Sequence, residues 1–543
     1  MRRRVRSGLL AQTAAIVTAA LVGCAPPGGG GSAPAGDPAT GAPAERSVGR
    51  FDPEAWITLG DFRFVEAVAV SQTTAFLGTT GGVERYDTLR DRWLSPVTAA
   101  DGLPDDRVTA LAVDPVGDDV WIGTRRGLAH LVFDGTVETA WGPPPTIVQE
   151  LRIDPADGSV YAFVAGGWWR GRGGSPVFDR SEPPPTNAGG SVDVEDVDPR
   201  TLPWTDPLYV RSPADPALVF RLTRLTRDLR GDYYAGTWGD NGRRWGAARA
   251  DWEALHFGLG GPPGGPMART ADGTWFATGP GAAPTPPALA FADTAGRWSY
   301  RVPGRTPGLP TASARALLGA GDTLWMGSDL GLSRRVGDDW TTWGWDAEPP
   351  IGAVTALAID GDRLWLGTDQ GLLAFDTASG RAVGVHLRGR EVTALVAVPG
   401  TVYVGSAGGL WVGVRGAQAD SFGRLSTLGS EVRALARMGE LLAVGTGTGL
   451  EIRPLTGGEP RQVLAGGQLA DPPISLAADE EGFWIGTRTG LVRYRPGTEE
   501  WQRFGQEDGL AGAPVLHLLA ETGAVWASTR RGVTRFDWRG AGR

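Results

Sequence analysis

This sequence contains no lysine: all 52 basic residues are arginine. Schiff-base chemistry on a lysine amine and a phosphate-binding loop lysine are therefore excluded. With one cysteine, Cys24, the chain cannot form an intrachain disulfide. Histidine is almost as scarce, and the four residues, His130, His256, His386 and His517, do not have the spacing of a metal site. We therefore expect neither a metal ion nor another cofactor.

Long apolar runs are missing beyond the N-terminus, where four arginines precede an apolar run at residues 8–22. This run is too short to span a membrane and is typical of an export signal. It ends in the letters LVGC, which resemble the bacterial lipobox, in which the cysteine is lipidated. We predict a signal peptide at residues 1–23, a lipidated Cys24 and a Gly/Pro/Ala-rich tether at 24–50. A cleaved secretory peptide with an incidental cysteine is the alternative.

The charge balance excludes one class of partner. Without the four arginines of the signal peptide, 48 basic residues face 61 acidic ones, a net charge of about −13. Nucleic-acid binding needs a basic surface, so we expect no nucleic-acid partner. The lipid anchor predicts a membrane-bound protein of the cell envelope, on the outer membrane if the cell has two membranes.

A seven-residue phrase recurs eleven times along the chain. It consists of an aromatic residue, any residue, Gly or Ala, Thr or Ser, two variable residues and Gly. Successive copies start about 38 to 50 residues apart, except for one gap near 73, and a period of about 40 is typical of propeller blades. The clear copies begin at Trp121, Trp325, Trp365, Tyr403, Trp484 and Trp526, and weaker copies begin at Phe76, Tyr161, Tyr234 and Trp275. One further copy, which begins at Ala443, lacks the aromatic residue.

Each repeat can be divided into four short strands. An Ala-rich apolar segment such as 108–114 supplies the first strand, the phrase supplies the second, and its variable residues form the hairpin to the third. Segments such as Leu491–Tyr494 and Trp501–Gly505 supply the third and fourth strands. We therefore predict an all-β fold, a β-propeller of four-stranded antiparallel blades.

The number of rings is open at this point. We favour two tandem propellers: residues 51–251 with four or five blades and an insertion at 174–207, and residues 252–543 with seven blades. In this arrangement the Trp56 segment completes the first ring and the Trp252 segment completes the second. The alternative is one large ring of about eleven or twelve blades, with Trp56 pairing near residue 535 instead of near residue 245.

The repeated phrase, with segments such as Trp501–Leu510, resembles the two-component regulator propeller repeat. In that family, propellers often form the sensor halves of hybrid histidine kinases, and some recognise glycan fragments. The resemblance implies a propeller that binds a ligand or a partner protein. Because the sequence has no room for a kinase, we expect a lipid-anchored stand-alone member.

Candidate ligand-binding residues lie in the hairpins between second and third strands, which open onto the funnel face of a propeller. A basic sector of arginines could hold an anion through the guanidinium fork, opposite an acidic sector; solvated turn residues are the plain alternative. These candidates are Arg488, Arg530, Arg531, Asp329, Asp369, Arg125 and Arg126. The aromatic residues of the phrase are expected in the core, whereas those outside it, Trp168, Trp169, Trp238, Trp343 and Trp345, are better candidates for stacking on sugars.

The sequence thus favours a non-enzymatic binding protein, sensor-like, with a glycan fragment, a peptide fragment or an envelope protein as its partner. One alternative is a propeller lyase or hydrolase that works in the central funnel, with His517 and a neighbouring turn carboxylate as acid and base. Another is an accessory lipoprotein of an envelope or secretion assembly.

Overall fold

The computed structural model describes residues 55–539, apart from 114–118, 133–134, 173, 213–216, 249, 280–288, 311–312, 417–419 and 428–430. The predicted signal peptide, Cys24 and tether lie outside these residues. Within the described residues, all regular structure is β-strand except for four short 3₁₀ turns, η2 (Ala99–Asp101), η3 (Val194–Asp196), η4 (Pro199–Thr201) and η5 (Gln506–Asp508). The strands form eleven antiparallel sheets, ten of four strands and one of six, which confirms the predicted blades.

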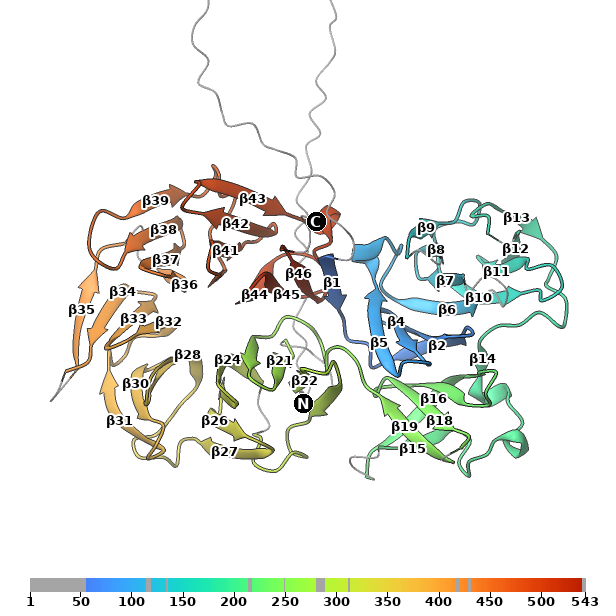
Figure 1. Ribbon diagram of the computed structural model, residues 1–543, viewed down its shortest axis with the longest axis horizontal. Helices are drawn as coiled ribbons and strands as arrows, with labels where there is room; N and C mark the ends of the chain where they lie inside the picture. Colours follow the sequence, from blue (N-terminus) through green and yellow to red (C-terminus); the bar gives the residue numbers. More distant parts are fainter. Residues whose placement is uncertain are drawn as a thin grey trace, which may run out of the picture. The chain divides into compact units, whose positions relative to one another are not determined.

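Four sheets come from residues 65–255 (blue to green in Figure 1), and we call them the small group. Their strands are β2 (Val65–Val70), β3 (Thr74–Thr79), β4 (Gly82–Asp87) and β5 (Arg92–Val97); β6 (Val108–Val113), β7 (Val120–Thr124), β8 (Gly127–Leu131) and β9 (Val137–Thr139); β10 (Val148–Ile153), β11 (Val160–Val164), β12 (Gly167–Gly171) and β13 (Phe178–Ser181); and β14 (Val192–Asp193), β15 (Tyr209–Arg211), β16 (Val219–Arg227), β17 (Tyr233–Thr237), β18 (Gly242–Gly246) and β19 (Asp251–Leu255).

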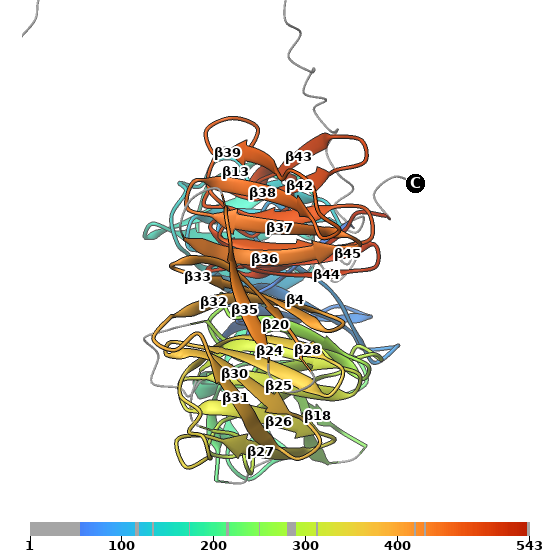
Figure 2. The same cartoon turned by 90° about the vertical axis from the view of Figure 1, so that its left-hand side faces the viewer.

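Seven sheets contain the strands from residue 267 onward, and we call them the large group. Their strands are β20 (Met267–Thr270), β21 (Gly273–Ala277), β22 (Leu289–Asp293) and β23 (Trp298–Arg301); β24 (Ala314–Ala320), β25 (Thr323–Ser328), β26 (Gly331–Val336) and β27 (Asp339–Trp343); β28 (Val354–Asp360), β29 (Arg363–Thr368), β30 (Gly371–Asp376) and β31 (Arg381–His386); β32 (Val392–Val398), β33 (Thr401–Ser406), β34 (Gly409–Val414) and β35 (Ser421–Leu425); β36 (Val432–Met438), β37 (Leu441–Thr446), β38 (Gly449–Pro454) and β39 (Arg461–Leu464); β40 (Ser475–Ala478), β41 (Phe483–Gly486), β42 (Leu491–Arg495) and β43 (Glu500–Phe504); and β44 (Val515–Glu521), β45 (Ala524–Thr529) and β46 (Val533–Asp537) with β1 (Trp56–Leu59). Figure 2 shows β36 to β39 in spatial succession within one sheet.

The glycine at the third position of the phrase sets the spacing between neighbouring sheets. A Cβ placed on Gly367 of β29 would lie 2.6 Å from Cγ1 of Val392, the first residue of the next sheet. Thr355 of β28 reaches the same neighbour, because its Oγ1 donates to the Val392 carbonyl over 2.6 Å. A side chain at the glycine would therefore push adjacent sheets apart.

The equivalent glycine and threonine contacts in the fourth sheet of the small group show which sheet packs against it. A Cβ on Gly236 of β17 would lie 2.6 Å from Cγ1 of Val65, and Thr223 Oγ1 donates to the Val65 carbonyl over 2.8 Å. Val65 begins the first sheet, so the fourth sheet packs on the first. In the large group, the first strands contact one another in order from β20 to β44, and β44 contacts β20. That series of seven sheets closes on itself.

The predicted roles of the Trp56 and Trp252 segments are wrong. β1 pairs with β46 in the last sheet of the large group, with Trp56 opposite Phe536, and Figure 1 shows the two strands side by side. The Trp252 segment is β19, which pairs with its own hairpin partner β18. Pairing across a short hairpin has a small loop-closure cost, so the fourth sheet needs no distant strand. The last sheet has three strands of its own and takes its fourth from β1.

The small group is therefore inserted into the large one, between β1 and β20. The two connecting segments run together, since the Leu259 N–H donates to the Gly60 carbonyl over 3.0 Å. A Cβ on Gly258 would lie 2.4 Å from Phe62, which is fully buried. Pairing of the Trp56 segment near residue 535 was expected only for a single large ring. In the structure this pairing instead completes the closed series of seven sheets in the large group.

The predicted insertion at 174–207 is only partly an insertion. It contains β13, the fourth strand of the third sheet, so the added residues begin after Ser181. Part of the added segment lies at the inner strands. The Gly189 and Ile153 backbones exchange hydrogen bonds of 2.8 Å at the free edge of β10, and Ser191 Oγ accepts from the Val68 N–H of β2 over 3.2 Å. Residues 189–191 thus occupy the inner edge of two sheets of the small group.

Candidate ligand-binding face

The hairpins that carry the predicted site residues are held by the Thr or Ser of the phrase. Thr124 Oγ1 donates to the Gly127 carbonyl over 2.8 Å and accepts from the Arg126 N–H over 3.2 Å. Thr368 and Thr529 make the same pair of bonds in their hairpins. Because the hydroxyl satisfies the turn, the two variable residues point outward, and all seven predicted residues are exposed.

These seven residues do not form one site. Arg125 and Arg126 belong to the small group, and Arg126 Nε lies 3.5 Å from Asp105 Oδ2. The other five belong to the large group, on two pairs of neighbouring sheets. One pair of sheets carries Arg488 and Arg530–Arg531, and the other pair of sheets carries Asp329 and Asp369.

Of the five predicted residues in the large group, two already have ionic partners. Arg531 Nη2 lies 3.8 Å from Asp106 Oδ2 of the small group, so this arginine contributes to the contact between the two groups. Asp329 Oδ1 lies 2.5 Å from Arg315 Nε of β24. Exposed pairs of this kind contribute at most about 1 kcal/mol and can be exchanged for a ligand.

Trp345 is an exposed aromatic residue next to the two sheets that carry Asp329 and Asp369. It lies in the loop between β27 and β28 and is 66% exposed. A methyl group placed on Gly352 would lie 3.2 Å from Trp345 Cη2 and 3.8 Å from Asp369 Oδ1, so the indole and the carboxylate flank the same point. Leu330, 44% exposed, belongs to the neighbouring hairpin. The Trp345 indole and the Asp369 carboxylate together make what we call the Trp345 face.

The loop that carries Trp345 is anchored. The N–H groups of Ala347 and Ile351 both donate to the Gly344 carbonyl, over 3.1 and 3.0 Å. Ile351 is fully buried in the core between two sheets, together with Leu332 and Val354. A rigid aromatic side chain loses little conformational entropy on binding, so ordering this loop would add little to the cost of binding a ligand. Trp345 was among the sequence candidates, but its proximity to Asp369 could not be predicted from the sequence.

The other four irregular tryptophans pack against neighbouring side chains. Trp168 lies against Phe163 with ring centroids 5.2 Å apart, and Arg180 lies over Trp169 at 4.9 Å. Trp343 packs edge-on against Phe375 at 5.2 Å, and Trp238 against Phe64 at 5.1 Å. Of the phrase aromatics, Trp121, Trp275 and Trp484 are fully buried, as expected for the core.

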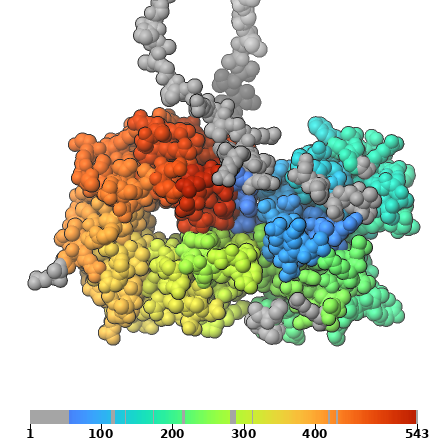
Figure 3. Space-filling view, viewed as in Figure 1, coloured from blue at the N-terminus to red at the C-terminus, as the bar shows by residue number. Residues whose placement is uncertain are grey.

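The large group surrounds an opening. Figure 3 shows it between the orange, yellow-green and red parts of the chain. The first strands of the sheets, such as β28, β32 and β36, lie next to it. His517 belongs to one of these strands, β44, and desolvation lowers its pKa to about 4. An imidazole with this pKa is neutral at pH 7 and is a weak base, which argues against the acid–base role considered for it.

The remaining histidines contact neighbouring side chains. His130 stacks on Trp121 with centroids 4.3 Å apart, His256 Nε2 lies 3.0 Å from Asp240, and His386 packs on Phe422 at 4.7 Å. The described residues contain no group of three or more His, Cys, Asp or Glu side chains arranged for a metal ion. Nor does a helix long and apolar enough to cross a membrane occur among them.

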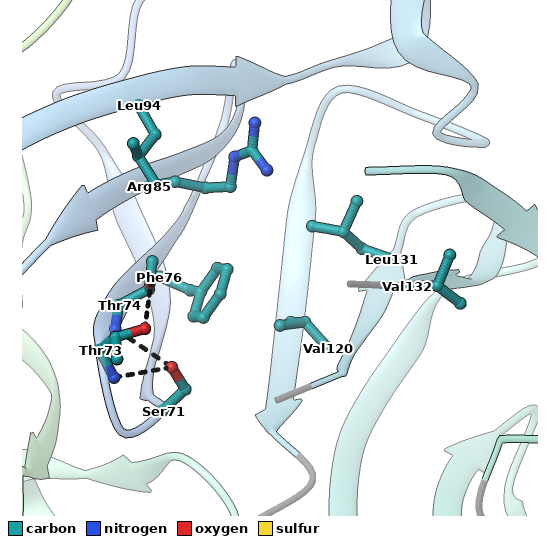
Figure 4. A pocket seen from close by; sticks show the side chains of 9 residues that line it. All are labelled: Ser71, Thr73, Thr74, Phe76, Arg85, Leu94, Val120, Leu131 and Val132. Atoms are coloured by element: carbon teal, nitrogen blue, oxygen red, sulfur yellow. Dashed lines mark hydrogen bonds between the residues drawn. The ribbon is translucent and has the colours of Figure 1, made fainter. Parts of the chain in front are cut away.

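A small pocket of about 160 Å³ lies between the first two sheets of the small group. Figure 4 shows Phe76 on one side and Val120 and Leu131 on the other. Its polar groups are already bonded: Ser71 Oγ accepts from the N–H groups of its own turn, and Arg85 Nε donates to the Ser95 carbonyl over 2.7 Å. We regard this pocket as a packing gap.

The sheets and their order define a β-propeller protein. The model of the two component regulator propeller family matches residues 102–126, which include the Trp121 phrase as far as Arg126. This match confirms the resemblance predicted for the repeat. No curated protein matches the chain.

Solved structures of propellers are similar to this chain. PorZ, described as an essential surface component of the type-IX secretion system of Porphyromonas gingivalis, is 14% identical, with 89% of this chain and 87% of PorZ covered and a TM-score of 0.54. The extracellular domain of a protein described as a hybrid two-component system of B. thetaiotaomicron is also 14% identical, with 87% and 68% covered and a TM-score of 0.44.

Proposed function

We propose that this protein is a non-enzymatic, lipid-anchored binding protein of the cell envelope, which captures a glycan or peptide fragment at the Trp345 face. The observation that carries the proposal is the pairing of Trp345 with Asp369 around Gly352. An indole offers an apolar face to a sugar ring or a peptide side chain. The carboxylate beside it accepts hydrogen bonds from hydroxyl or N–H groups, which sets orientation.

The surroundings of Trp345 support a binding role over a structural one. An indole that is 66% exposed contributes little to the core, and its loop is held by Ile351 instead. The Asp329–Arg315 pair on the neighbouring hairpin adds a carboxylate and a guanidinium that can rearrange around a polar ligand. The lipid anchor at Cys24 would hold the propeller at the membrane while leaving this face in solution.

The direct test is a thermal-shift screen of the purified protein against oligosaccharides, peptidoglycan fragments and short peptides. Binding to the folded state raises the melting temperature, and the rise grows with the logarithm of the ligand concentration once the site is saturated. We expect Trp345→Ala to abolish the shift. The control is Trp141→Ala, which removes another exposed indole, 71% exposed, from the small group. Equal loss in both variants would contradict the proposal.

A scaffold role is the second candidate, and the similarity to PorZ over 89% of this chain supports it. In that case the propeller would hold a protein partner in an envelope assembly. Crosslinking in intact envelopes, followed by purification, distinguishes the two. One abundant crosslinked protein together with no ligand-induced shift would favour the scaffold.

A further inference from the structure

A second pocket lies far along the chain from the Trp345 face, at the six-stranded sheet of the small group. Its volume is about 220 Å³. It is bounded on one side by the added segment with β15 and on the other by β16 and β19. We call it the Trp204 pocket, and its lining residues are Trp204, Thr205, Asp206, Tyr209, Val210, Arg211, Val219 and Trp252.

The aromatic wall of the pocket is fixed before any ligand arrives. Trp204 packs on Trp252 with ring centroids 4.6 Å apart and on Tyr233 at 5.2 Å, both edge to face. Trp252 in turn meets Trp245 at 5.5 Å. Each ring is held by others, so the wall cannot collapse into the pocket. The opposite side is more open, since Tyr209 is 47% exposed.

The polar rim is also positioned. Asp206 Oδ1 accepts from the N–H groups of Leu208 and Tyr209, each over 3.1 Å. These bonds fix the carboxylate at the pocket edge, and its Oδ2 makes no hydrogen bond within the described part of the chain. The indole N–H of Trp204 is shielded from solvent and has no acceptor among the same residues.

The charges of the lining select the type of ligand. Asp206 would repel an anion, and Arg211 would repel a cation. A neutral molecule with several hydroxyl groups can donate a hydrogen bond to the Asp206 carboxylate and accept one from the Arg211 guanidinium. The apolar face of such a ring can lie on an indole. Drug-sized ligands occupy about 300–1,000 Å³, so this smaller pocket fits a single ring.

We infer that the Trp204 pocket is a binding site for one neutral, polyhydroxylated ring of hexose size. Trp204 and Trp252 supply the stacking wall, Asp206 accepts hydroxyl hydrogens, and Arg211 and Thr205 bond further hydroxyl groups. This site is independent of the function proposed for the Trp345 face. A ligand with so few atoms binds weakly, with a dissociation constant of about 1–10 mM.

Saturation-transfer NMR on the purified protein with glucose, galactose and N-acetylglucosamine tests the inference. We expect saturable transfer from at least one sugar, weakened at least tenfold by Tyr209→Ala. Asp206→Asn keeps an oxygen that can accept from the two turn N–H groups but removes the charge, and we expect it to weaken binding as well. Leu229→Ala, which removes a 90% exposed side chain from the hairpin turn between β16 and β17 of the same sheet, is the matched control and should change nothing.

Three outcomes would overturn the inference. The first is no transfer from any of the three sugars at 20 mM, roughly twice the weakest dissociation constant expected. The second is transfer that persists in both pocket variants, and the third is a preference for methylammonium or acetate over the sugars. Trp345→Ala should leave this binding unchanged, so failure at the Trp345 face and failure at the Trp204 pocket are distinguishable.

Discussion

The side-chain amide of Asn241 donates from Nδ2 to Oε1 of Glu84 over 3.0 Å, and both residues are fully buried. Asn241 Oδ1 lies 2.9 Å from the hydroxyl of Tyr300, a residue of β23 in the large group. Glu84 belongs to β4 in the first sheet of the small group, and Asn241 lies in the hairpin between β17 and β18 of the fourth sheet. One buried amide therefore joins both groups at the point where the chain passes between them.

Glu84 should make the stability of the protein depend on pH. Burial raises the pKa of its carboxyl well above the usual value, and the nearby Asp61 carboxylate raises it further, although the Asn241 bond opposes both. The folded state thus binds a proton more tightly than the unfolded chain. The stabilisation is complete below the unfolded pKa, about 4.3, and is lost as pH rises toward the folded pKa.

We expect Glu84→Gln to remove the loss of stability at high pH, because the glutamine side chain still accepts a hydrogen bond from Asn241 but carries no charge. At pH 8 the variant should be more stable than the parent by at least about 1 kcal/mol. Urea unfolding between pH 5 and 9 measures this difference. If the difference did not change across that range, Glu84 would not be the titrating group.

Trp56→Ala should open the large group at its last sheet. The Trp56 ring stacks on Phe536 with centroids 4.1 Å apart and is 4% exposed. Loss of a buried tryptophan costs about 3–5 kcal/mol. Chemical unfolding measures the loss, and Trp141→Ala, an exposed tryptophan, should change stability by less than about 0.5 kcal/mol. Equal effects would contradict the pairing of β1 with β46.

Gly236→Ala tests whether the fourth sheet of the small group packs on the first. The added methyl would lie 2.6 Å from both Val65 Cγ1 and Thr223 Oγ1, and overpacking of this kind costs about 1–3 kcal/mol. Gly423→Ala is the matched control, because a methyl group there meets nothing within 4 Å. We expect that control to be neutral or slightly stabilising in an unfolding titration. A neutral result at Gly236 would argue against the contact.

The Trp345 face predicts a separation between binding and stability. Trp345→Ala should leave the free energy of unfolding within about 0.5 kcal/mol of the parent, because the side chain is mostly exposed. Ligand affinity, measured by calorimetry with whatever fragment the thermal screen identifies, should fall at least tenfold. Asp369→Asn should produce a smaller loss. A destabilised Trp345 variant would show that the indole has a structural role.

The basic sector remains a hypothesis that one triple variant can test. Replacing Arg488, Arg530 and Arg531 by Gln should change stability by no more than about 1 kcal/mol, since their side chains are exposed. Pyrophosphate binding at low salt should weaken at least tenfold. The comparison variant replaces Arg125 and Arg126 in the small group. If both variants bind pyrophosphate equally, these arginines are ordinary solvated turn residues.

The repeat made the blades predictable, and its Tyr234 copy, which lacks the final glycine, shows where prediction failed. In the Tyr234 copy, Asp240 stands where the other ten copies have glycine, and the hairpin is one residue longer. Asn241 takes the left-handed conformation, with φ at 56°, and Thr237 Oγ1 donates to its carbonyl over 2.8 Å. The extra residue places Asn241 against Glu84 and Tyr300. The sequence shows the irregularity but not its partners, since they lie 157 and 59 residues away.

The sequence by itself determined the blade, because each feature of the phrase acts locally. Glycine permits close approach of the next sheet, Thr or Ser satisfies the hairpin, and the aromatic residue packs between sheets. Tertiary structure alone decided how the blades close. Whether β1 pairs near residue 245 or near residue 535 depends on which sheet has an unpaired edge and an apolar surface for Trp56. Such a contact joins residues some 480 positions apart, and only the folded chain brings them together.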